Sequence, residues 1–78
     1  MEERIIFSEI KGINSLTSLF GLVFPDTATE FQKAALTMAY IVASFRDNIL
    51  KGNEIPQELI EVADQLWLIV MDNEYKQR

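Results

Sequence analysis

Carboxylates are the only plentiful reactive side chains in this sequence, and four of them lie within eleven residues: Glu54, Glu58, Glu61 and Asp64. Paired carboxylates can transfer protons or bind divalent cations, but both uses need burial or further converging ligands. The chain has neither histidine nor cysteine, so it lacks the usual zinc ligands, and its serines have no histidine base to activate them. The pattern predicts a solvated acidic helix face, and no catalytic residue, metal site, cofactor or enzyme activity.

The charge distribution indicates what kind of partner this acidic face would suit. The net charge is −5, and residues 54–78 hold six acids against two bases. Such a chain has no basic footprint for phosphate backbones, so we expect no direct nucleic-acid binding. An acidic surface beside apolar residues suits a basic protein partner. The alternative is that these acids only complement helix dipoles and aid solubility.

Nothing in the sequence predicts a membrane or secretory segment. The longest uncharged stretch, residues 12–25, is fourteen residues long and contains several polar side chains, whereas a helix needs about 20 apolar residues to span a bilayer. The N-terminus is too acidic for a signal peptide. We therefore expect a cytoplasmic protein with no membrane association.

Apolar periodicity and glycine placement predict an all-α fold, a single domain over residues 1–78 built as a three-helix bundle. The helices are expected at roughly 4–20, 27–51 and 56–75. Gly21 and Gly52 lie where helix C-terminal glycines belong, and Thr27 with Glu30 matches the capping box. Residues 4–7 could instead be extended, because short apolar runs do not reveal their period.

The 27–51 helix carries two periodic patterns. One apolar stripe is expected to face the core, namely Phe31, Ala35, Met38, Val42, Phe45 and Ile49. Small residues at Ala35, Ala39 and Ala43 predict a close helix contact along one edge. Phe24, in the extended connector before Pro25, is expected to plug one end of the core.

The apolar content exceeds what a single-chain core of this size uses. Residues 66–71 are all apolar, so that part of the third helix must be covered on every side. A compact bundle that buries Trp67 and exposes Leu68 would account for this. We favour a homodimer that completes the bundle, because small domains without disulfides or metals often need association. Its interface is predicted to contain Tyr40, Ile41, Trp67, Leu68 and Met71.

These features predict a non-enzymatic protein–protein interaction module. The expected protein is a small homodimeric regulator, inhibitor or immunity-type protein that binds a basic or apolar protein surface. Two alternatives remain open: an acidic nucleic-acid mimic that blocks a DNA-binding protein, and a structural helical oligomer without a regulatory partner.

Overall fold

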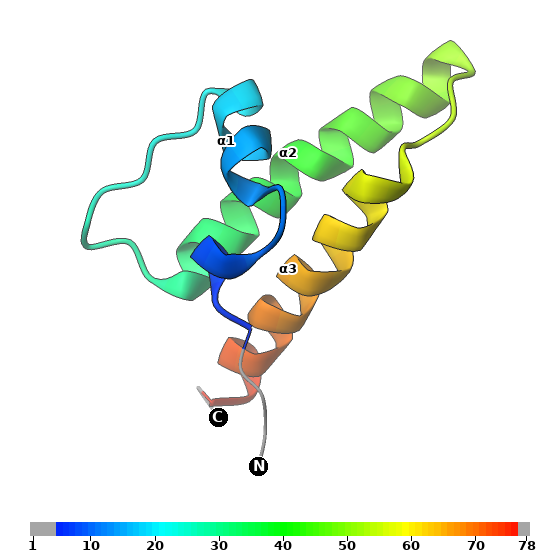
Figure 1. The fold of residues 1–78 in the computed structure, drawn as a ribbon. Helices are drawn as coiled ribbons and strands as arrows, with labels where there is room; N and C mark the ends of the chain where they lie inside the picture. Colours follow the sequence, from blue (N-terminus) through cyan, green and yellow to red (C-terminus); the bar gives the residue numbers. More distant parts are fainter. Residues whose placement is uncertain (1–4, 77–78) are drawn as a thin grey trace.

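Two long helices dominate the fold. The computed structural model describes residues 5–76, and the side chains of residues 5–72. A 3-10 turn, η1 (Phe7–Glu9), precedes the helices α1 (Ile13–Phe20), α2 (Glu30–Lys51) and α3 (Gln57–Lys76). Helices α2 and α3 form an antiparallel hairpin, with η1 and α1 on one side of it (Figure 1). The predicted all-α fold with three helices is confirmed for the described residues, which contain no strand.

The predicted single helix over 4–20 is wrong, because the chain breaks at Gly12. This glycine has φ 83°, a left-handed conformation that interrupts a right-handed helix. The segment therefore divides into η1 and the eight-residue α1. Ile6 is extended, as in the alternative considered for residues 4–7, but Phe7 already belongs to η1, and Arg4 lies outside the described residues.

The other two glycines end helices as predicted. Gly21 and Gly52 both have positive φ. At each end the next residue's N–H reaches back to a carbonyl five positions earlier, from Leu22 to Thr17 and from Asn53 to Asn48, both at 2.9 Å. These are Schellman ends. The connector then folds inward as expected, because Phe24 packs edge to face on Phe7 with ring centroids 5.6 Å apart.

Helix α2 begins later than predicted. The capping box is formed by Thr29 and Gln32, since the Thr29 hydroxyl accepts from the Gln32 N–H at 3.0 Å and the Gln32 carbonyl oxygen Oε1 accepts from the Thr29 N–H at 2.9 Å. The box predicted at Thr27 is wrong because Glu30 has another partner. Its carboxylate accepts from the backbone N–H of Phe7 at 2.8 Å and so joins η1 to α2.

The core lies between the hairpin and the N-terminal segment. Its buried apolar side chains are Phe7, Ile10, Ile13, Ala34, Ile41, Val62, Ala63, Leu66 and Ile69. Thr37 is also fully buried, and its hydroxyl donates to the Lys33 carbonyl at 2.8 Å. Helix α3 matches its predicted range within one residue. Over the described residues, no helix has the length and apolar character needed to cross a membrane.

Candidate interaction surface

The stripe predicted for α2 faces the core only in part, because Met38 and Phe45 pack against the core while other members lie outside it. Ala34, Thr37 and Ile41 face the core, whereas Val42 and Ile49 of the predicted stripe are 55% and 65% exposed. Ala39 and Ala43 are exposed too, so the close helix contact predicted along that edge is wrong. Helix α2 thus buries Thr37 fully while it leaves the apolar side chains of Val42 and Ile49 more than half exposed.

Helix α3 shows the same arrangement. Leu66 is fully buried, but the next residue, Trp67, is 54% exposed. Ile60 and Met71, which lie seven residues before and four after Trp67, are half-buried. These three side chains recur at helical spacing and form a second apolar stripe beside the buried one.

Both exposed stripes lie on the same side of the hairpin. Val42 follows the buried Ile41 by one residue, and Trp67 follows the buried Leu66 by one, so each is turned by about 100° in the same sense around its helix. Because α2 and α3 run antiparallel, this equal rotation brings both stripes to one side of the two-helix layer. We call this side the open face; it consists of Phe31, Ala35, Val42, Ile49, Ile60, Trp67 and Met71.

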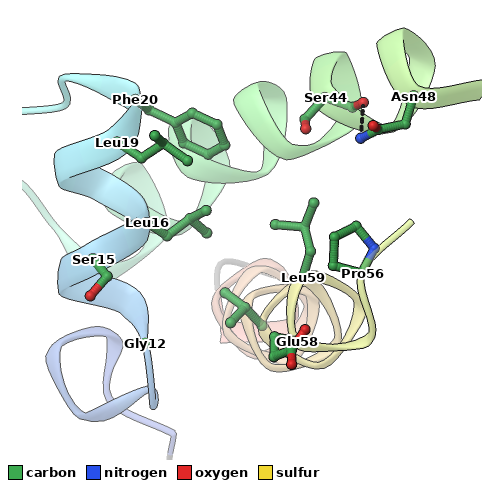
Figure 2. A pocket seen from close by; sticks show the side chains of 11 residues that line it. Gly12, Ser15, Leu16, Leu19, Phe20, Ser44, Asn48, Pro56, Glu58 and Leu59 are labelled. Carbon is green, nitrogen blue, oxygen red and sulfur yellow. Dashed lines mark hydrogen bonds between the residues drawn. The ribbon is translucent and has the colours of Figure 1, made fainter. Parts of the chain in front are cut away.

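The opposite side of the layer is covered by η1 and α1. Tyr40 precedes Ile41 by one residue, and its ring lies 5.5 Å from that of Phe20 in α1. Further along, α1 borders a groove of about 350 Å³ between itself, the end of α2 and the start of α3. Leu16, Leu19 and Phe20 point into this groove from α1, and Leu59 points into it from α3 (Figure 2).

Polar groups at the groove are few. Ser44 and Asn48 line it from α2, and the Asn48 side-chain amide donates to the Ser44 carbonyl at 3.0 Å. Glu58 lies at its edge from α3 (Figure 2). Among the described residues, no buried side-chain nitrogen or oxygen lacks a hydrogen-bond partner. The groove is therefore a largely apolar recess without a reactive group aimed into it.

The structure separates the five residues predicted for the dimer interface. Trp67 and Met71 lie on the open face, and Leu68 is exposed one position further round α3. Tyr40 lies on the other side of the layer, against Phe20. The prediction for Ile41 is wrong: this side chain is 0% exposed because it packs in the chain's own core.

The four predicted acidic residues are all exposed, but they do not form one cluster. Glu54 lies in the loop before α3, and Glu58 borders the groove in the first turn. Glu61 and Asp64 lie on the outer side of α3, with Asp64 next to the open face because it stands four residues after Ile60. Within the described part of the chain, no three carboxylates come together in a way that could hold a metal ion.

Sequence reasoning missed five residues of this surface: Phe31, Ala35, Val42, Ile49 and Ile60. The signal was present, because Val42 and Ile49 belong to an apolar stripe at helical spacing. The sequence predicts this stripe to face the core because its apolar residues recur at helical spacing. Comparison of the chain with protein-family models, curated proteins and solved structures found no match.

Proposed function

We propose that this chain is a non-enzymatic protein–protein interaction module that acts as a homodimer. The open face binds a second copy, and the acidic outer surface of α3 binds a partner protein with a basic or apolar surface. Such a protein would act as a regulator, an inhibitor or an immunity-type protein.

The observation that carries this proposal is that α2 leaves apolar side chains exposed along one side. The helix packs Ala34, Thr37 and Ile41 against its own chain and leaves Val42 and Ile49 largely in water. Full burial of a side chain of this kind contributes about 1.5–3 kcal/mol. Trp67 adds a large aromatic surface to the same face. A second copy would remove all three from water on both sides of the interface.

The acidic surface supports the second half of the proposal. Leu68 is exposed on the outer side of α3, beside Glu61, which is also exposed. An apolar side chain beside a carboxylate suits a basic, partly apolar partner, since complementary potentials raise the association rate and disfavour wrong pairings.

Sedimentation equilibrium at micromolar concentrations tests the proposal. We expect a mass of twice 9.0 kDa for the natural chain and a mass near 9.0 kDa for Trp67→Glu, which places a charge on the open face. Val23→Glu is the matched control, because Val23 is 92% exposed in the loop and lies outside that face. Circular dichroism shows whether each variant keeps its helices. A natural chain that stays monomeric throughout would overturn the proposal.

A further inference from the structure

We propose that the second copy binds with its α3 over α2 and its α2 over α3, so that Arg46 of each copy pairs with Asp64 of the other. This inference rests on the proposed function, because it specifies how the two open faces meet. The result is a four-helix bundle in which each long helix has antiparallel neighbours.

Arg46 and Asp64 lie at opposite edges of the open face. Arg46 follows Val42 by four residues and precedes Ile49 by three, so it borders the stripe of α2. Asp64 has the same relation to Ile60 and Trp67 in α3. Both side chains are exposed, and no salt bridge engages either of them within the described residues. One edge of the face is thus basic, and the other is acidic.

The two charges lie in the same half of the hairpin. Arg46 stands in the second half of α2, which ends at Lys51, and Asp64 stands in the first half of α3, which begins at Gln57. Because the two helices run antiparallel, both residues lie in the half of the hairpin nearer its turn. A two-fold rotation about an axis parallel to the helices keeps this level, so the Arg46 edge of one copy faces the Asp64 edge of the other.

Two symmetric ways of stacking the open faces are possible. In a two-fold dimer the same patch meets itself. If the two-fold axis runs parallel to the helices, α2 lies over α3 of the second copy and each basic edge meets an acidic edge. If the axis runs across the helices, α2 lies over α2, and edges of like charge meet. Charge complementarity therefore selects the first arrangement.

A charge-exchange experiment tests this arrangement. Arg46→Glu and Asp64→Lys are prepared as separate variants, and dimer dissociation constants are measured by sedimentation equilibrium at low salt. Each variant alone places two repulsive pairs at its interface, so we expect a Kd about tenfold higher than that of the natural chain. A mixture of the two variants forms a heterodimer in which both pairs attract again, and its Kd is expected to return to the natural value.

Matched controls change the same charges away from the open face. Asp26→Lys serves for Asp64→Lys, and Lys11→Glu serves for Arg46→Glu, because both positions are exposed. Neither control is expected to change the Kd. Recovery in the mixture also shows that both variants are folded.

The possible outcomes separate the inference from the proposed function. A natural chain that never dimerises overturns both. A chain that dimerises while Arg46→Glu and Asp64→Lys alone keep the natural Kd overturns only the arrangement, and so does a mixture that stays as weak as the single variants. The arrangement is supported if each single variant dimerises with a raised Kd and the mixture of the two variants returns to the natural Kd.

Discussion

The two sides of the α2–α3 layer differ in what covers them. On one side, η1 and α1 close over the hairpin, and Phe20 packs on Tyr40. On the other side, Val42, Ile49 and Trp67 remain more than half exposed. The covered side gains its burial from the chain itself, whereas no segment among the described residues covers the open face. An apolar helix stripe therefore does not by itself identify the interior of a small domain.

The length of α1 explains why only one side is covered. At 1.5 Å per residue its eight residues extend about 12 Å, whereas the 22 residues of α2 extend about 33 Å. The break at Gly12 leaves the rest of the N-terminal segment as one 3-10 turn and extended chain. A segment of this size can cover part of one face, but not two.

The largest effect on the free energy of unfolding is expected from a change in the buried core between the two faces. Leu66 is fully buried, so Leu66→Ala should lower the free energy of unfolding by about 2–5 kcal/mol through lost burial and a cavity. Leu68→Ala, two residues along the same helix and exposed, should change it by less than about 0.5 kcal/mol. Urea denaturation measures both. Equal losses would show that Leu66 is not part of the core.

The next effect separates the open face from the covered side. Ile49→Glu places a charge among apolar side chains in each half of the proposed interface, and we expect the dimer Kd to rise about a hundredfold. Leu19→Glu introduces the same charge at an exposed position in α1 and should leave the Kd unchanged. Analytical ultracentrifugation gives both constants. If Leu19→Glu were the variant that dissociates the dimer, the interface would lie on the α1 side.

A smaller effect is expected where α1 attaches to the hairpin. Phe20→Ala removes a half-buried ring that contacts Tyr40, and should lower the free energy of unfolding by about 1–3 kcal/mol. The dimer Kd should not change once the chain is folded, because this contact lies on the covered side. Thermal denaturation and ultracentrifugation check the two statements. A large change in the Kd would mean that the two faces are not independent.

The smallest effect on stability and dimerisation is expected from charge reversals on the acidic side of α3. The double change Glu58→Lys and Glu61→Lys alters exposed side chains, so stability and dimerisation should stay within about 0.5 kcal/mol. Binding of a basic partner should weaken, and the binding of the natural chain should fall as salt is added. Affinity capture from the native host, with isothermal titration of any captured protein, measures this. Unchanged binding after the charge reversal would exclude this surface as the partner site.

Local signals predicted much of the fold. Gly21 and Gly52 ended helices as expected, because a glycine with positive φ closes a helix wherever the following residue can fold back. The break at Gly12 was harder to predict, since a glycine can also be tolerated inside a helix at a cost of about 1 kcal/mol. The choice between Thr27 and Thr29 as the cap depended on Glu30, whose contact with Phe7 comes from tertiary structure.

The candidate site was less predictable because it depends on which stripe is covered. Ile41 and Val42 are adjacent and similar, but Ile41 is fully buried in the core whereas Val42 is 55% exposed, a difference that depends on how α2 is turned toward its neighbours in the fold. The buried stripe includes Thr37, which hydrogen-bonds to its own helix and so needs no polar partner in the core. Trp67 could be identified as surplus to the core, since α3 has apolar residues all round near it.

The central claim is that a second copy covers the open face, and the most direct measurement is the fluorescence of Trp67 against chain concentration. Trp67 is the only tryptophan in the chain, and it is more than half exposed in a single copy. From nanomolar to high micromolar concentrations, we predict a shift of its emission to shorter wavelength and a loss of acrylamide quenching. A spectrum and quenching that stay constant over the whole range would contradict the claim.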